Sequence, residues 1–152
     1  MGEGGLLEII NLSNPIFKGY IFYSALLILK VLAMAILTGF QRFKNMVFVN
    51  PEDAAVFKCK PKIDANVERV RRAHLNDLEN IPIFFVAGFG YMLTNPPVRT
   101  ALMLFKIFTI ARFLHSLVYA VVKVPQPARG LAWGTGYCIT GFMAVKTLLH
   151  FL

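Results

Sequence analysis

The sequence predicts an all-α integral membrane protein, a bundle of four transmembrane helices, on three observations. The 152-residue chain is 57% hydrophobic and only 16% charged, whereas soluble domains are about 45–50% apolar and about 25% charged. Four apolar tracts approach the roughly 20 residues that a helix needs to cross a bilayer. Basic residues concentrate in the connections that four spans would place on one side of the membrane.

Each tract has its own character, and together we expect them to form a single domain of residues 1–152. The expected spans are residues 17–41, 71–94, 99–122 and 128–150. The apolar tract of the first, from about Gly19 to Gln41, is interrupted only by Lys30, and the fourth span contains Lys146. The second reaches spanning length only if it begins before Ile81, inside a charged run. A soluble helical bundle is the alternative, but its helices would carry a polar stripe along most of their length.

The connections between the tracts differ in charge. The long polar loop, residues 42–70, includes the turn-forming stretch "NPED" (50–53), in which proline fixes φ. Eight Lys and Arg residues lie in or directly after this loop, whereas the opposite connection holds only Arg99. Because cytosolic loops are enriched in Lys and Arg, we expect the long loop in the cytosol and both termini in the lumen.

The net charge of +8 follows this topology. It therefore does not indicate a nucleic-acid partner, although a basic cytosolic rim favours anionic lipid headgroups. The two cysteines, Cys59 and Cys138, lie in a loop and in a span. They predict neither a disulfide framework nor a metal site.

Acidic residues are distributed unevenly. Six of the eight lie between Glu52 and Glu79, and none follows Glu79. Arg112, in the middle of the third span, therefore has no acidic partner in its own half of the chain. A cation within a bilayer costs about 2.5–3.5 kcal/mol on insertion scales. We therefore expect Arg112 to meet a carboxylate from elsewhere in the protein or from a ligand.

Polar side chains recur at helical spacing in three of the predicted spans, so each set shares one helix face. The sets are Arg72, Asn76 and Glu79, then Arg112, His115 and Tyr119, then Arg129, Trp133 and Tyr137. All lie near the cytosolic ends of their spans, where Arg42 closes the first span. They predict a polar pocket, rich in cations with one or two carboxylates. Such a pocket suits a small hydrophilic ligand that bears carboxylates and an amine.

The same stripes have a structural interpretation. Polar side chains within spans also form the interhelical hydrogen bonds that hold a bundle together. His115 taken alone is typical of a core histidine, and Tyr119 and Tyr137 are typical of interface aromatics. A channel would also place charges inside spans, but no repeated ring-forming motif is present. Spacing alone leaves these alternatives open.

Four stretches are distinctive: "VFVNPEDAAVF", "VERVRRAHLNDLENIPIFF", "ARFLHSLVYAV" and "PQPARGLAWGTGY". They resemble the MAPEG family of membrane-associated proteins in eicosanoid and glutathione metabolism. The resemblance covers nearly all of the chain, and the second stretch is long and specific. Leu75, "PQPAR" and "GYCIT" favour the family's glutathione transferase branch. The prostaglandin synthase branch, the near alternative, has arginine in place of Leu75.

The resemblance implies four spans per chain, a homotrimer, and glutathione held between subunits near the cytosolic face. It implies the endoplasmic reticulum membrane, with the mitochondrial outer membrane as a second location. The glutathione-binding residues that it implies are Arg42, Arg72, Asn76, Glu79, His115, Tyr119, Arg129 and Tyr137. Glu79 would bind the α-amino group, and Arg129 would face the sulfur. Asp53 would lie at the cytosolic edge of the site, whereas His74 and Asp77 would be structural.

Arg129 is the expected catalytic residue. Gly130 follows it where the synthase branch has a serine proposed as the thiol's partner, so activation by that serine is not expected here. The thiolate is the nucleophilic form of a thiol, and a nearby fixed positive charge favours it. Arginine stays charged throughout the working pH range. We therefore assign thiol activation to Arg129.

We expect a membrane glutathione transferase that conjugates glutathione to lipophilic electrophiles. Candidates are aryl halides and unsaturated carbonyls, and lipid hydroperoxides would be reduced. One alternative is a prostaglandin E synthase, an isomerase that uses glutathione as its cofactor. The other is a non-enzymatic membrane regulator, against which Arg129 counts because such relatives need not keep that residue.

Overall fold

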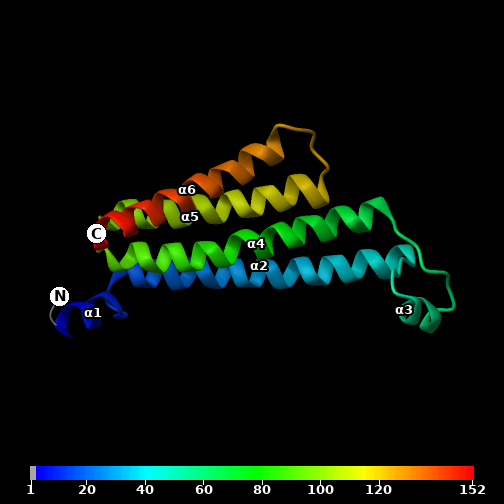
Figure 1. Ribbon diagram of the computed structural model, residues 1–152, viewed down its shortest axis with the longest axis horizontal. Helices are drawn as coiled ribbons and strands as arrows, with labels where there is room; N and C mark the ends of the chain where they lie inside the picture. The colour runs from blue at the N-terminus through cyan, green and yellow to red at the C-terminus, as the bar shows by residue number, and fades with distance from the viewer. Residues whose placement is uncertain (1–2) are drawn as a thin grey trace.

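The computed structural model describes residues 3–152 as a helical protein (Figure 1). Four long helices run along the molecule, and shorter helical segments lie at its two ends. In chain order the elements are α1 (Glu3–Ile9), α2 (Pro15–Asn45), α3 (Pro51–Val56), α4 (Ala65–Leu93), α5 (Val98–Ser116), the π-helical segment η1 (Leu117–Val121) and α6 (Ala128–Phe151). No strand occurs in residues 3–152.

The starts of two long helices follow from local capping. Asn14 precedes α2, and its side chain accepts a hydrogen bond from the backbone N–H of Ile16 at 2.8 Å. Asp64 caps α4 by accepting from the N–H groups of Asn66 and Val67. Such side chains satisfy donors that have no partner within the first turn. Because Asp64 is a strong cap, α4 begins at Ala65, earlier than the expected start at residue 71.

The loop of residues 42–70 is more helical than expected. Helix α2 continues to Asn45, and the "NPED" stretch opens the short helix α3 rather than a simple turn. Pro51 occupies the first position of α3, where its missing N–H costs nothing and its fixed φ suits a helix.

The four long helices form an antiparallel bundle. Helix α2 packs against α4 and α5, and α6 packs against the same two helices. Phe84 of α4 and Phe108 of α5 stack with ring centroids 3.9 Å apart at the centre of the core. Leu27 of α2 and Met143 of α6 are fully buried in the same cluster.

Two of these helical stretches are long and apolar enough to cross a membrane. They are Pro15–Asn45 and Val98–Val121, the latter comprising α5 and η1. Helices α4 and α6 have sufficient length, but neither contains a stretch that combines the required hydropathy with so few charges. The first half of α4 carries most of the charge of that helix, and glycine and threonine residues lower the hydropathy of α6. Polar residues in these two helices, which the sequence assigns to a pocket, therefore weaken the apolar signal.

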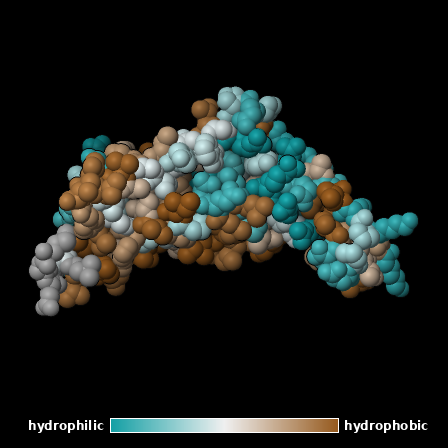
Figure 2. All heavy atoms as spheres, viewed as in Figure 1, coloured by the Kyte–Doolittle hydropathy of each residue, from teal (hydrophilic) through white to brown (hydrophobic). Residues whose placement is uncertain are grey.

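The two ends of the bundle differ in chemistry. Both described ends of the chain lie at one end, and α3 and the connection between η1 and α6 lie at the other (Figure 1). Hydrophilic side chains gather over the half that carries α3, and hydrophobic side chains predominate over the half near the termini (Figure 2). The charged segments of α4 and the basic connections therefore share one end of the molecule.

Candidate functional site

A cavity of about 420 Å³ opens where α4, the end of α5, η1 and the start of α6 meet. Small-molecule sites are commonly about 300–1,000 Å³. The lining side chains are Arg72, Leu75, Asn76, Glu79, His115, Tyr119, Gln126, Arg129, Gly130 and Trp133. We call this space the polar cavity. It lies within the half of the molecule where hydrophilic side chains gather (Figure 2).

The wall from α4 presents Arg72, Asn76 and Glu79 on one helix face. Arg72 Nε donates to the carbonyl oxygen of Glu68 at 3.3 Å, one turn earlier. The carboxylate of Glu68 is bound by Arg71 at 2.8 Å, and this hydrogen bond holds the pKa of Glu68 below its usual range. Glu68 therefore stays ionised and engaged outside the cavity. Among the described lining residues, Glu79 is the single carboxylate.

The wall from α5 and η1 presents two rings. His115 and Tyr119 meet edge to face, with centroids 5.6 Å apart. Tyr119 lies within the π-helical turn of η1, a widening that occurs frequently at functional sites. His115 is buried, and its Nδ1 has no hydrogen-bond partner within residues 3–152. A buried polar atom without a partner is uncommon, so a ligand atom in the cavity is a natural partner for this nitrogen.

The wall from α6 is organised by Arg129. Its guanidinium carbon lies 4.3 Å from the centroid of the Tyr119 ring, and this cation–π contact restrains the charge at the cavity. Beside it, the Gly130 N–H donates to Gln126 Oε1 at 3.1 Å. Trp133 stacks on Tyr137 with centroids 5.0 Å apart. The cavity thus combines two arginines, one carboxylate and several neutral polar groups.

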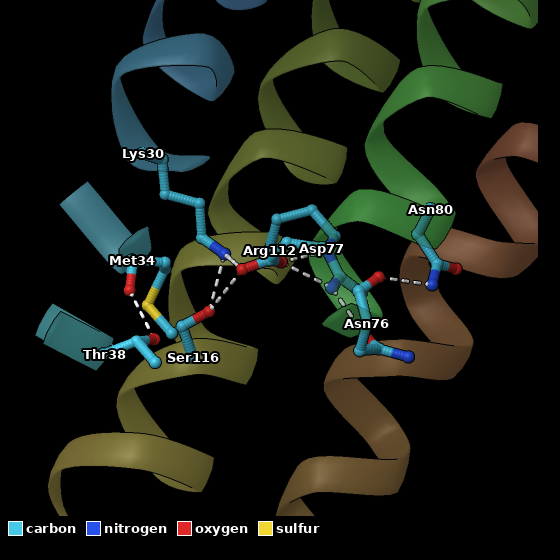
Figure 3. Close-up of polar contacts among 8 residues, drawn as sticks. All are labelled: Lys30, Met34, Thr38, Asn76, Asp77, Asn80, Arg112 and Ser116. Carbon is cyan, nitrogen blue, oxygen red and sulfur yellow. Dashed lines mark hydrogen bonds and ion pairs between the residues drawn. The ribbon is translucent and has the colours of Figure 1, made fainter. Parts of the chain in front are cut away.

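A buried polar network lies behind the α4 wall (Figure 3). Asp77 of α4 accepts from Arg112 Nη2 at 2.6 Å and from Ser116 Oγ at 3.0 Å, and it pairs with Lys30 of α2. Lys30 Nζ also donates to Ser116 Oγ at 2.5 Å. The side chains of Asp77 and Arg112 are both 0% exposed. One carboxylate therefore joins α2, α4 and α5.

The network is connected directly to the cavity wall. Arg112 Nη2 donates to Asn76 Oδ1 at 2.8 Å, and Asn76 lines the polar cavity. The Asn76 backbone carbonyl in turn accepts from Asn80 Nδ2 at 2.7 Å (Figure 3). The buried ion pairs thus fix the orientation of an amide that lines the polar cavity.

A family model described as the MAPEG family matches residues 20–149, almost the whole chain. This chain belongs to the MAPEG family. Membership fits the features already described, a helical bundle with membrane-spanning stretches and a polar cavity at one end.

Proteins of two different names are among those similar to this chain. Microsomal glutathione S-transferase 1 of Mus musculus is 44% identical over 143 residues, which cover 90% of this chain and 92% of the relative. The protein of the same name from Homo sapiens is 38% identical over the same shares. Prostaglandin E synthase of Bos taurus is 36% identical over 144 residues, covering 92% of this chain and 91% of the relative. The resemblance inferred from the four sequence stretches is confirmed.

Most residues that the family resemblance implied lie together in this MAPEG chain. The polar cavity brings together Arg72, Asn76, Glu79, His115, Tyr119 and Arg129. Arg112 does not line the cavity. The carboxylate that pairs with Arg112 belongs to Asp77 of the same chain, in the neighbouring helix α4. The structural role expected of Asp77 agrees with its place in the buried network.

Three expected residues lie outside the cavity in the single chain. Tyr137 is exposed and lines an adjoining groove of about 410 Å³ between α4 and α6, which shares Glu79 and Trp133 with the cavity. Arg42 is in the last turn of α2 and is not among the lining residues. Asp53 is exposed in α3, where Asn50 Nδ2 donates to its carboxylate at 3.2 Å.

Sequence reasoning missed two features of this MAPEG site. Gln126 lines the cavity from the connection before α6, and no periodicity exists in a connection to point to it. Lys30 was noted only as an interruption in an apolar tract. The available signal was the charge of Lys30, because a cation buried in a span needs an acidic partner. That partner is Asp77 of α4.

Proposed function

We propose that this chain is a membrane glutathione transferase that conjugates glutathione to lipophilic electrophiles. The names of its relatives, microsomal glutathione S-transferase 1 at 38–44% identity, support this activity. The chemistry of the polar cavity is the observation that carries it. Glutathione bears two carboxylates, one amine and one thiol, and the cavity offers two arginines, one carboxylate and further hydrogen-bonding groups.

Each cavity residue has a proposed part in binding glutathione. Arg72 binds a carboxylate of the tripeptide through charge-assisted hydrogen bonds. Glu79 receives the α-amino group, and Asn76 hydrogen-bonds the backbone, held by Arg112. His115 and Tyr119 line the opposite wall, where the free Nδ1 of His115 meets a ligand atom.

The thiol is activated by Arg129 in this proposal. The guanidinium is restrained over Tyr119, and a fixed cation beside a thiol favours the thiolate. The thiolate sulfur attacks the electrophilic carbon and forms a C–S bond. With an aryl halide, halide then leaves with the electron pair of the broken bond. The thiol proton is released to water when glutathione binds.

The proposed membrane arrangement supplies the second substrate. All four long helices span the endoplasmic reticulum membrane as one domain, with the α3 end in the cytosol and both termini in the lumen. The mitochondrial outer membrane is a second location. Apolar electrophiles then reach the polar cavity from the lipid, through the groove between α4 and α6 that adjoins it.

A homotrimer completes the proposed site. Arg42 and Tyr137 do not reach the polar cavity of their own chain. Under this proposal they contact glutathione bound between two neighbouring subunits.

A second candidate activity is a prostaglandin E synthase, favoured by the relative of that name at 36% identity. The decisive experiment gives the purified protein, with glutathione, a chromogenic aryl halide in one assay and a prostaglandin endoperoxide in another. We expect rapid glutathione conjugation of the aryl halide. Endoperoxide isomerisation without conjugation would instead assign the synthase activity.

A further inference from the structure

A second, smaller hollow of about 250 Å³ lies between the end of α2, the start of α4 and the end of η1. It shares no lining residue with the polar cavity. Its lining residues are Gln41, Lys44, Asn45, Asn66, Arg69, Val70, Ala120, Val121 and Lys123. We call it the basic basin. It belongs to the same end of the bundle as α3, because α2 ends and α4 begins there (Figure 1).

The basin concentrates positive charge without neutralising it. Lys44, Arg69 and Lys123 come from three different segments, and none of them takes part in an ion pair within residues 3–152. The carboxylates close by in sequence are already engaged. Glu68 binds Arg71, and Asp64 caps α4. Uncompensated cations that share one concavity raise the local concentration of anions.

Two of these cations, Lys123 and Arg69, are held by the structure around them. Lys123 Nζ donates to Asn66 Oδ1 at 2.7 Å, and the Lys123 backbone has φ of 55°, a left-handed conformation that a lysine rarely adopts. Arg69 Nε is buried and has no hydrogen-bond partner in the described chain. Buried donors are nearly always satisfied, so Arg69 has an unused donor for an acceptor atom.

Three apolar side chains also line the basin. Val70 and Ala120 are buried at its base, and Val121 at its margin is 60% exposed. Val121 also ends the second stretch that is long and apolar enough to cross a membrane. The basin therefore places three cations directly beside a hydrocarbon surface, an arrangement that fits a charged headgroup with an attached acyl chain.

We propose that the basic basin is a binding site for a phosphate group. Phosphate oxygens accept charge-assisted hydrogen bonds from arginine and lysine, and the amides of Asn66 and Gln41 are further donors. The adjoining Val121 favours the phosphate of an anionic membrane lipid over a soluble phosphate. Polybasic segments attract anionic membranes diffusely, whereas this basin holds one phosphate per chain.

The test uses the full-length protein in a neutral detergent, with phosphatidic acid or phosphatidylcholine added, and native mass spectrometry to count retained lipids. We expect one tightly retained phosphatidic acid per chain and no matching retention of phosphatidylcholine. Arg69→Gln and Lys123→Gln should each lower the affinity for phosphatidic acid at least fivefold. Lys60→Gln removes the same charge from the exposed loop and should change it less than twofold.

A competition arm separates the two sources of phosphate. If millimolar inorganic phosphate displaces the lipid and binds the wild type, but not Arg69→Gln, a soluble phosphate is the ligand of the basin. If inorganic phosphate has no effect, the ligand of the basin is the phosphate of the lipid. Equal losses in Arg69→Gln, Lys123→Gln and Lys60→Gln would overturn the proposal, because they indicate diffuse attraction. Helicity and glutathione binding, measured in every variant, establish that each protein is folded.

Discussion

At the scale of single residues, helical spacing located the polar cavity because its side chains lie on regular helices. Arg72, Asn76 and Glu79 share a face of α4, and the cavity uses that face. Spacing could not separate the cavity-lining residues of the third predicted span, His115 and Tyr119, from Arg112, which does not line the cavity. Arg112 and His115 share a face of α5, but Arg112 reaches α4 behind the cavity wall. Whether a side chain lines the cavity or is buried behind it depends on which helix packs opposite. The periodicity of a single helix does not indicate this.

Arg72→Ala tests the binding role at this scale. We expect glutathione affinity to fall roughly tenfold to a hundredfold, because a hydrogen bond to a charged group contributes about 1.5–3 kcal/mol. Isothermal titration calorimetry with glutathione measures it. The matched control is Arg71→Ala, which removes the neighbouring arginine whose partner is Glu68 outside the cavity. An affinity within twofold of wild type in folded Arg72→Ala would assign Arg72 to the structural network.

At the scale of elements, two adjacent residues of α4 have different roles, one at the polar cavity and one inside the bundle. Asn76 faces the polar cavity, whereas Asp77 faces the bundle and joins α2 to α5 through Lys30 and Arg112. The sequence showed a surplus of basic residues in the second half of the chain but not how it is compensated. The acid that Arg112 needs comes from its own chain. For Arg112, the shortage of acids therefore does not require a second subunit.

Asp77→Asn should destabilise the bundle strongly. Removing one partner of a buried ion pair costs about 3–5 kcal/mol, and this change leaves both Lys30 and Arg112 without a counter-charge. We expect a clearly lower unfolding temperature in detergent, followed by circular dichroism. Asp53→Asn removes the same charge from exposed α3 and should leave the transition unchanged. Equal unfolding temperatures for the two variants would show that the network does not hold α2, α4 and α5 together.

At the scale of the whole molecule, the helical architecture followed from composition and the four apolar tracts, because burial in lipid demands long apolar helices. The start of α4 could not be predicted as well, because the helix begins at Ala65 as a charged, capped segment where a loop was expected. The periodicity of polar and apolar residues within one chain does not indicate how many subunits assemble. Two residues of the expected site, Arg42 and Tyr137, lie outside the polar cavity of the single chain. Together with the family resemblance, this is the reason to predict a trimer.

The predicted assembly is a homotrimer with glutathione at the subunit boundaries. Native mass spectrometry or chemical cross-linking in a mild detergent should give three chains per particle. If Arg42 acts from a neighbour, mixing inactive Arg42→Ala chains with inactive Arg129→Leu chains should restore partial activity in mixed trimers. A monomer that turns over glutathione at the full rate would contradict the prediction.

The central claim is that the polar cavity holds glutathione as a thiolate beside Arg129. The direct measurement is the near-ultraviolet absorbance of the thiolate, titrated against pH with glutathione saturating. Wild type should show thiolate at neutral pH, and Arg129→Leu should show it only at higher pH, because the pKa of the bound thiol rises without the cation. Each pH unit of that change corresponds to about 1.36 kcal/mol. Arg99→Leu, at the opposite end of the bundle, should match wild type, whereas an identical titration in Arg129→Leu would contradict the account.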